Sequence, residues 1–321
     1  MKQAKRLTIR SSAIRIITIL ACSCFAAIFP QNSPGQGSEI RSITIVSEPK
    51  AVVWIDDLRY GITDSAGKFT VSSVLAGRHT IRVRANGFKE ASKPITAAQK
   101  GDIEIPLTKT TDEAELAFQE GETQSSIDRE KAAAAYLKAV KLRPKFVDAY
   151  IGLARVYSDG GKLENAEKAI RDVRRIKPVL PESSAIMGRV YKDGGEEEKA
   201  IAEFNRAIKE GRGVQPEAYT GLGLLHKDRA EAHGGAAEYE QENASYNEAA
   251  KYFSAAAKQL GSSPDAMVVY QLLGLVYERQ KKNKEAIATY QTFLRIFPDS
   301  PEATAVRSFI EQIKKQPVQQ N

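Results

Sequence analysis

Residues 39–109 alternate between apolar and polar positions in short runs, each bounded by Gly, Asp, Pro or Ser. The runs are SITIVS at 42–47, AVVWID at 51–56, KFTVSS at 68–73, HTIRVRA at 79–85 and DIEIPL at 102–107. Val, Ile and Thr dominate these runs, and a period of two places the apolar side chains on one face of a β-strand. We therefore expect six or seven antiparallel strands in this segment, which suits a small β-sandwich.

From residue 112 onward the apolar positions follow a longer period. An Ala that opens the second of two predicted helices recurs at positions 132, 166, 200, 249 and 286. Twelve residues before it stands a small residue at Ala154, Gly188 and Gly274, and Gly223 has the same role ahead of an insertion. The first two intervals are 34 residues long, and two amphipathic helices per unit of this length resemble the tetratricopeptide family. The resemblance implies stacked helix pairs with a hollow side lined by the first helices.

Glycine recurs at one position inside the first helices, although it costs about 1 kcal/mol relative to Ala in a helix. We expect a packing reason at Gly188 and Gly274: a small residue on the first helix and an Ala on the second let the two backbones approach closely. The aromatic residues of the second helices are then expected to fill the gap to the next unit. These aromatic residues are Phe204, Phe253 and Tyr290.

Five such units are expected, the first of them degenerate, with a final helix at 301–316 whose polar outer positions cap the stack. The fourth unit is irregular, because 26 residues instead of 12 separate Gly223 from Ala249. Its glycine pair, Gly234-Gly235, comes five residues late. The simplest interpretation lengthens both helices of this unit into a protruding hairpin, and the alternative is an irregular surface loop.

The turns of the β segment resemble the PEGA family. The segments that carry the resemblance are SEPKAVVWIDDLRYGIT at 47–63 and LAGRHTIRVRANGF at 75–88. The chain departs from the pattern because Lys50 replaces the Gly before Ala51, Asp57 replaces a turn Gly and Asp64 replaces a Pro. The segment TDSAGKF at 63–69 resembles instead the carboxypeptidase regulatory-like family. Both resemblances imply a β-sandwich accessory module, so they agree on the fold.

The first 37 residues have the layout of a secretory signal peptide: a basic start, an apolar run at 16–29 and a polar, Pro- and Gly-rich end. The apolar run is shorter than the roughly 20 residues that span a bilayer as a helix. Cleavage after Ala26, Ala27 or Gly35 would export the chain to the periplasm or cell envelope. An uncleaved anchor and a lipoprotein attached through Cys22 are the alternatives; membrane contact is expected only through this segment.

The chain is thus expected to be multi-domain: a leader at 1–37, a PEGA-like all-β sandwich at 38–110 and an all-α tetratricopeptide superhelix at 112–316. Its net charge of +7 suggests nucleic acid at first sight. Five of the basic residues lie in the leader, however, and the remaining chain has 42 basic and 40 acidic residues. A broad phosphate-binding face is therefore not expected.

Binding is expected in the groove lined by the first helices. The groove positions of the tetratricopeptide family give nine candidate residues: Asp148, Arg155, Asp159, Arg189, Lys192, Thr220, Lys227, Gln271 and Arg279. Arg155, Arg189 and Lys192 form a modest basic stretch that would suit a carboxylate or an acidic peptide. The alternative is that these charges only solvate an exposed face.

No catalytic, metal-binding or cofactor-binding motif is recognisable. His226 stands where other units have Tyr, so packing accounts for it. The sequence therefore predicts a non-catalytic exported scaffold, without cofactor, that binds a protein or peptide partner. The alternative is an envelope-attached module whose β-sandwich binds glycan while the repeats space or oligomerise it.

Overall fold

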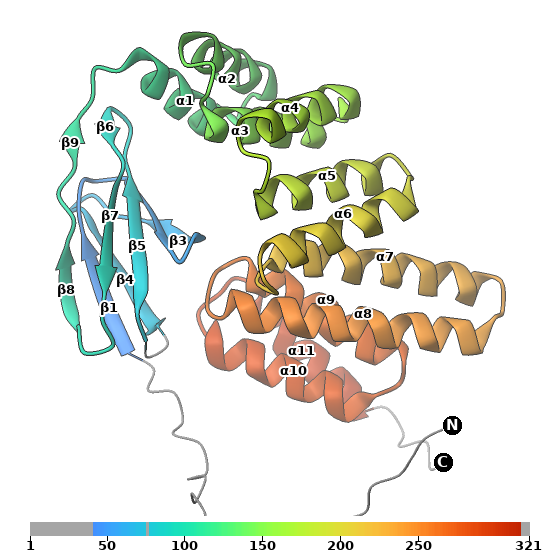
Figure 1. Cartoon of the computed structure of the whole chain (residues 1–321). Helices are drawn as coiled ribbons and strands as arrows, with labels where there is room; N and C mark the ends of the chain where they lie inside the picture. The colour runs from blue at the N-terminus through green and yellow to red at the C-terminus, as the bar shows by residue number, and fades with distance from the viewer. Residues whose placement is uncertain (1–40, 75–76, 316–321) are drawn as a thin grey trace, which may run out of the picture. The chain divides into compact units, whose positions relative to one another are not determined.

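The computed structural model describes residues 41–74 and 77–315, which form a β region followed by a helical region (Figure 1). The predicted leader lies outside the described residues. The described residues belong to one compact unit. The predicted division at 110–112 therefore remains a sequence-based prediction, although each region has apolar clusters of its own.

The β region consists of three sheets. The strands are β1 (Arg41–Val46), β2 (Val52–Ile55), β3 (Leu58–Ile62), β4 (Lys68–Val74), β5 (His79–Arg84), β6 (Phe88–Lys89), β7 (Ala91–Ile95), β8 (Gly101–Glu104) and β9 (Thr108–Lys109). Their orders are β4-β1-β8, β3-β2-β5-β7 and β6-β9. The two larger sheets enclose one apolar cluster that contains Ile43 and Ile45 of β1 and Val53 and Ile81 of the other sheet. This is the expected β-sandwich.

Two details of the sheets differ from the sequence prediction. β1 pairs with β8 in parallel, with Ile45 opposite Ile103, so the strands are not all antiparallel. Strands β3 and β7 were not recognised in the sequence. β7 contains Pro94, which cannot donate a backbone hydrogen bond, and the strand is tolerated because it lies at the edge of its sheet.

The backbone is left-handed at two non-glycine positions, which are the positions where the PEGA resemblance would place Gly. Lys50 has φ 59° and Asp57 has φ 65°. A nearby Thr secures the first of these turns, because the Thr63 hydroxyl accepts from Ala51 N and donates to Glu48 O, both at 2.7 Å. The turn at Lys50 is thus maintained by hydrogen bonds in place of glycine.

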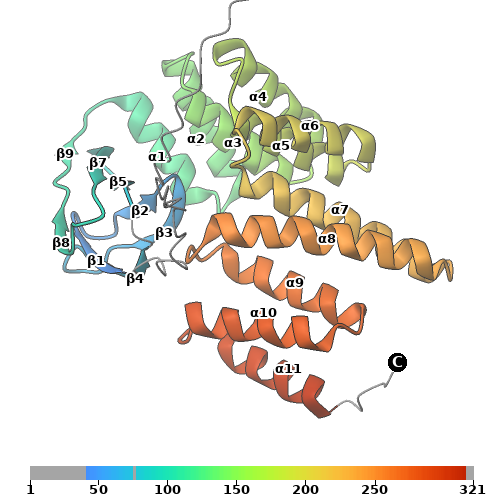
Figure 2. The same ribbon diagram turned by 60° about the horizontal axis from the view of Figure 1, so that its bottom comes forward.

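The helical region has eleven helices within the described residues (Figure 2). They are α1 (Glu113–Gln124), α2 (Arg129–Leu142), α3 (Val147–Asp159), α4 (Leu163–Ile176), α5 (Pro181–Asp193), α6 (Glu197–Glu210), α7 (Pro216–Gly235), α8 (Tyr239–Leu260), α9 (Ala266–Arg279), α10 (Asn283–Ile296) and α11 (Ala303–Lys315). Consecutive helices pack on one another, and α1, α3, α5 and α7 also contact in series. The first ten helices form the five predicted pairs. The eleventh is the predicted cap, since Val306 and Ile310 are buried and the residues between them are exposed.

The repeated glycines accommodate aromatic rings, which corrects the prediction that they face an Ala and a neighbouring backbone. A Cβ added at Gly188 would lie 2.6 Å from the ring of Phe204, and one at Gly274 would lie 2.3 Å from the ring of Tyr290. The Phe204 ring also reaches the next unit, where a Cβ at Gly221 would lie 2.2 Å from it. The prediction that the aromatic residue of the second helix fills the gap to the next unit is therefore confirmed for Phe204.

The insertion in the fourth unit forms the predicted helical hairpin. α7 has 20 residues and α8 has 22, against 13 and 14 in the preceding pair. The glycine pair Gly234-Gly235 is not the turn, because α7 continues through it. The left-handed residue of the connection is instead Ala237, with φ 60°.

Candidate functional site

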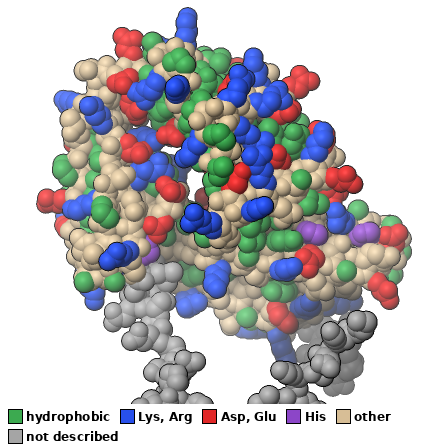
Figure 3. Space-filling model, in the orientation of Figure 1, with side chains coloured by type: hydrophobic (Ala, Val, Ile, Leu, Met, Phe, Trp, Pro, Cys, Tyr) green, Lys and Arg blue, Asp and Glu red, His purple; other side chains and the backbone are tan. Residues whose placement is uncertain are grey.

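A cavity of about 1810 Å³ lies between the first helices and the β3-β2-β5 face of the sandwich. The space-filling view shows the hollow, around which side chains of both charges gather (Figure 3). Six of the nine predicted residues line it: Asp148, Arg155, Asp159, Arg189, Lys192 and Thr220. Lys227, Gln271 and Arg279 are not among its lining residues. The helical wall of the cavity is therefore the part of the predicted groove that α3, α5 and α7 contribute.

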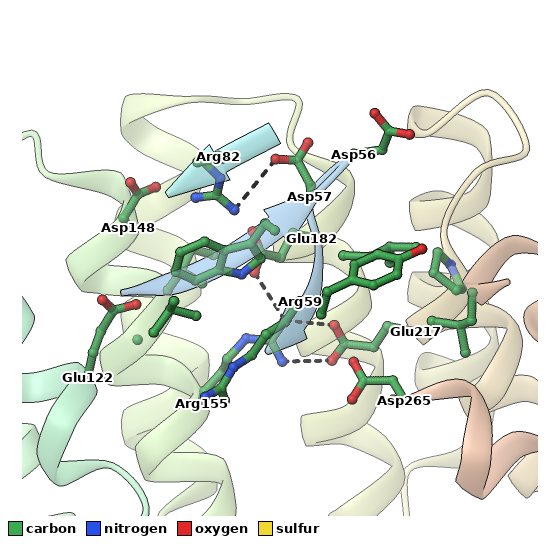
Figure 4. Close-up of a pocket in the computed structure, with 18 of the residues that line it drawn as sticks. Asp56, Asp57, Arg59, Arg82, Glu122, Asp148, Arg155, Glu182, Glu217 and Asp265 are labelled. Atoms are coloured by element: carbon green, nitrogen blue, oxygen red, sulfur yellow. Dashed lines mark hydrogen bonds and ion pairs between the residues drawn. The ribbon is translucent and has the colours of Figure 1, made fainter. Parts of the chain in front are cut away.

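Arg155 joins three successive first helices at the centre of the helical wall (Figure 4). Its guanidinium donates to both carboxylate oxygens of Glu217 on α7, at 3.1 and 2.7 Å, and to Glu182 on α5 at 3.1 Å. Burial lowers the pKa of Arg155, but the attraction of the two carboxylates outweighs it and raises the pKa above its ordinary value. Burial likewise raises the pKa of Glu217, yet Arg155 outweighs it, so the net pKa is lowered. Arg155 and Glu217 therefore both remain charged at neutral pH.

The other two cations of the predicted basic stretch also have partners within the chain. Arg189 lies 3.3 Å from a carboxylate oxygen of Asp159, and Lys192 lies 2.7 Å from one of Asp193. Each cation of the predicted basic stretch therefore faces a carboxylate of this chain, so the stretch offers an acidic peptide less free positive charge than its sequence suggested. Replacing any of these three cations would also leave its partner carboxylate without a counter-charge.

The opposite wall of the cavity is the outer face of the sheet β3-β2-β5. Val53 and Ile55 of β2 point into the sandwich core, so the alternate residues Val52 and Trp54 face the cavity. The guanidinium carbon of Arg82, on the neighbouring strand β5, lies 4.5 Å from the centre of the Trp54 ring. This wall thus combines an aromatic surface with a cation that lies over it.

Arg84 connects this wall to the first helix. It donates to Glu90 at 2.5 Å and to Glu122 of α1 at 2.6 Å. Burial raises the pKa of Glu122, and the attraction of Arg84 only partly offsets that effect. Gln119 of α1 adds two further bonds, accepting from Gly87 N and donating to Phe88 O, each at 2.8 Å. The sandwich is therefore firmly fixed to α1.

A second, smaller contact joins the sheet to the other end of the cavity. Ser263, in the loop between α8 and α9, donates from its hydroxyl to the carbonyl of Arg59 on β3 at 3.1 Å. Leu58 packs against the apolar cluster of α8 and α9. Burial raises the pKa of the Tyr60 hydroxyl, and a hydrogen bond with Ser262 opposes this shift. Strand β3 therefore bridges the hollow side of the repeats.

The sequence analysis missed this β wall, although a signal was present. The run at 51–55 is apolar at every position instead of alternating. A strand with apolar residues on both faces is usually covered on both. The exposed Ile62, at 47%, belongs to the same face and lines the cavity.

Within residues 41–74 and 77–315, no three His, Cys, Asp or Glu side chains gather as metal ligands would. His79, the first residue of β5, lies 2.5 Å from Asp56. His226 stacks on Tyr252 at a centroid distance of 5.3 Å. In the same part of the chain, no helix has the length and apolarity that crossing a membrane requires.

Comparison with known families identifies the repeats. One tetratricopeptide repeat model matches residues 128–181 and 235–301, and a second matches residues 181–210. Comparison with curated protein sequences gave no significant match. The C-terminal part of the chain is therefore a superhelix of tetratricopeptide repeats.

Several solved structures are similar to the helical region. Yeast Tom70 has 17% identity and a TM-score of 0.50, covering 64% of this chain and 40% of its own. A monomeric mutant of IFIT1 with Gppp-AAAA has 18% identity and a TM-score of 0.50, covering 64% and 47%. A crystal structure of MamA has 20% identity and a TM-score of 0.41, covering 61% and 96%. At these identities the likeness concerns the fold alone.

Proposed function

We propose that this chain, whose C-terminal part is a tetratricopeptide superhelix, is a non-catalytic scaffold that binds a segment of a protein partner in the cavity between its repeats and its β-sandwich. The observation that carries the proposal is the cavity itself, which six of the nine predicted groove residues line. Pockets for small molecules usually measure about 300–1,000 Å³. At about 1810 Å³ this one suits a length of polypeptide better.

The lining chemistry supports a peptide ligand. Val268 of α9 and Val214 before α7 are exposed at 61% and 67%, and both line the cavity. Trp54, on the sheet side, lines the same cavity. Burial of these exposed apolar side chains would favour peptide binding. The charged groups around them would fix the position of the peptide along the cavity.

The proposal includes an envelope location. It rests on the basic, apolar and polar order of the leader and on the PEGA-like turns of the β region. Mass spectrometry of the mature N-terminus tests the location. A start after Ala26, Ala27 or Gly35 supports export by cleavage, a modified Cys22 supports lipidation, and an intact Met1 in a cytosolic fraction contradicts export.

The binding site is tested by blocking the cavity without disturbing a core. Peptides selected from a displayed library on the full chain are measured by fluorescence anisotropy against the variants Val268→Trp and Val179→Trp. Val179 is the matched control, because it has the same 61% exposure and does not line the cavity. Val268→Trp is expected to weaken binding at least about tenfold, a change of ~1.4 kcal/mol. Equal binding by both variants contradicts the proposal.

Glycan binding by the sandwich is the competing function. The single Trp of the chain, the residue best suited to stack on a sugar ring, faces the repeats with Arg82 over its ring. A glycan array on the full chain tests this alternative. Binding that survives Val268→Trp would favour it over the peptide site.

A further inference from the structure

Two buried polar side chains of the helical region bond to the backbone of the β-sandwich. Gln119 of α1 is buried, and its amide accepts from Gly87 N and donates to Phe88 O, each at 2.8 Å. Ser263, in the loop between α8 and α9, is also buried and donates to the carbonyl of Arg59 on β3 at 3.1 Å. Neither Gln119 nor Ser263 lines the cavity. Because a buried polar group is costly without hydrogen bonds, both side chains depend on the position of the sandwich.

The two bonds attach the sandwich to repeats that are not neighbours. Gln119 belongs to the first pair of helices, and Ser263 follows the fourth pair. The helices α3, α5 and α7, which come between them, contribute lining residues to the cavity. In a stack of repeats each unit contacts chiefly its neighbours, so small adjustments at successive interfaces change the curvature of the stack. The separation between the first and fourth repeats would therefore vary if the repeats alone determined it.

The sandwich is rigid between its two points of attachment. Strand β2 pairs with β3 on one side and with β5 on the other, and Gly87 and Phe88 follow β5 closely in the chain. Strand β3 also packs on β4 of the other sheet, because a Cβ added at Gly61 would lie 2.4 Å from the ring of Phe69. Close-packed interiors deform little. The sandwich is therefore a rigid spacer between α1 and the loop that joins α8 to α9.

Ser263 determines where the spacer meets the fourth repeat. Leu58 of β3 packs on the apolar cluster of α8 and α9, and an apolar contact of this kind has no preferred direction. The hydrogen bond from Ser263 to Arg59 is directional, so it fixes the position of β3 along this loop. The hydrogen bond between Tyr60 and Ser262 supports the same position.

We infer that the β-sandwich holds the first and fourth repeats at a fixed separation, with Gln119 and Ser263 as positioning residues, and that this separation determines which peptides the cavity accepts. The inference rests on the proposed function and assigns a role in it to two residues that do not line the cavity. A cavity held at one width is pre-organised, which reduces the cost of ordering it when a peptide binds. Loss of either bond should weaken a peptide that fits and reduce discrimination against a bulkier one.

The test compares two serine variants of the full chain. Ser263→Ala removes the bond to the sandwich. Ser183→Ala is the matched control, because Ser183 is also buried, donates its hydroxyl to Leu180 O at 2.8 Å within the helical region, and does not line the cavity. Both variants lose one hydroxyl–carbonyl hydrogen bond, so a purely structural role predicts the same behaviour for both. Gln119→Leu, at the other attachment, is the second test variant and is expected to behave like Ser263→Ala.

The separation is measured by pulsed electron paramagnetic resonance between spin labels on Ser92→Cys of β7 and Asp299→Cys after α10. Both positions are exposed, and the only native cysteines are replaced by Cys22→Ser and Cys24→Ser. The unchanged chain and Ser183→Ala are expected to give the same narrow distribution of distances. Ser263→Ala is expected to give a broader distribution, because the repeats can then change their curvature.

Binding is measured by fluorescence anisotropy with a library-selected peptide and with an analogue in which one apolar residue is enlarged to Trp. Ser263→Ala is expected to weaken the selected peptide about threefold, since fewer molecules then have the fitted width. It should also reduce the ratio of the two dissociation constants about threefold, whereas Ser183→Ala should leave that ratio unchanged. Equal distance distributions or equal ratios for the two serine variants contradict the inference. If Val268→Trp then still weakens the selected peptide, the proposed function survives. If no peptide is sensitive to Val268→Trp, both fail.

Discussion

The β region and the repeats use glycine in opposite ways. At Lys50 and Asp57 the backbone adopts the left-handed conformation that favours Gly, and the chain has other residues there. At Gly188 and Gly274 the backbone is helical, which favours Ala, and the chain has Gly. The preference of the local backbone conformation therefore explains the residue type neither at the two turn positions nor at the two helix positions. In the turn at Lys50, hydrogen bonds of Thr63 fix the conformation. In the helices, the ring of Phe204 or Tyr290 occupies the space that a Cβ would need.

The second repeat supports this interpretation. At the position of Gly188 it has Ala154, and at the position of Phe204 it has Ile170. Both residues are fully buried in one apolar cluster. A smaller side chain on the second helix thus coincides with a larger one on the first, as close packing demands.

The largest expected effect comes from filling the space beside a ring. Gly188→Leu should destabilise the chain by about 3 kcal/mol, because the new Cβ alone would lie 2.6 Å from Phe204. Gly235→Leu is the control, since a Cβ there meets nothing within 4 Å. It should gain roughly 1 kcal/mol from helix propensity. Urea unfolding of the two variants measures both, and equal stability would mean that the ring does not select the glycine.

The next effect tests whether the two packing modes can be exchanged. Ala154→Gly should cost about 1 kcal/mol and Ile170→Phe about 1–3 kcal/mol. The double variant should be about 1 kcal/mol more stable than the sum of these losses, because the ring gains the space that the methyl group vacates. A double-mutant cycle in urea gives the coupling. Additive losses would show that the two positions do not pack on one another.

A smaller gain is expected in the turn. Lys50→Gly should stabilise the chain by about 1 kcal/mol, because a left-handed non-Gly residue costs roughly 1–2 kcal/mol. Lys68→Gly, in strand β4, is the control and should lose about 0.5–1 kcal/mol. If both substitutions destabilise equally, hydrogen bonds around Thr63 already remove the strain at Lys50.

The smallest effect concerns the repeat position where the fourth unit has His226 and others have Tyr. Burial and then the charge of Arg229 lower the pKa of His226 below its ordinary value of 6.5. The unfolded chain then binds a proton more readily, so this contribution to stability is present above pH 6.5 and is lost as the pH falls through the folded-state pKa. His226→Tyr should reduce the slope of stability against pH below that value. Unchanged slopes in urea unfolding would contradict the assignment.

Much of the fold could be predicted because it depends on periodicity. The five helix pairs, the cap and the hairpin of α7 and α8 follow from spacing and length. The parallel pairing of β1 and β8 could not be predicted, since alternation identifies a strand but not its neighbour. The role of the glycines was also missed, because the ring that needs the space lies on another helix.

The candidate site was only half predictable. The repeat period placed Arg155 and Thr220 correctly on the hollow side, where they line the cavity. It did not reveal Glu217 as the partner of Arg155, which lies 62 positions later and two helix pairs along. Nor did it reveal the cavity wall that includes Trp54, because a contact between the sandwich and the repeats does not produce a periodic pattern in the sequence.

The long hairpin of α7 and α8 has a part that packs on the other repeats and a tip that is not buried. Among residues 231–244, which include its turn, none is buried, whereas both helices have buried residues nearer the stack, such as Ala230 and Tyr246. Amide protons near the tip should therefore exchange with solvent through local opening that leaves the rest of the protein folded. The hairpin is thus a place where the chain can lengthen, shorten or change its surface at little cost to the stacked repeats.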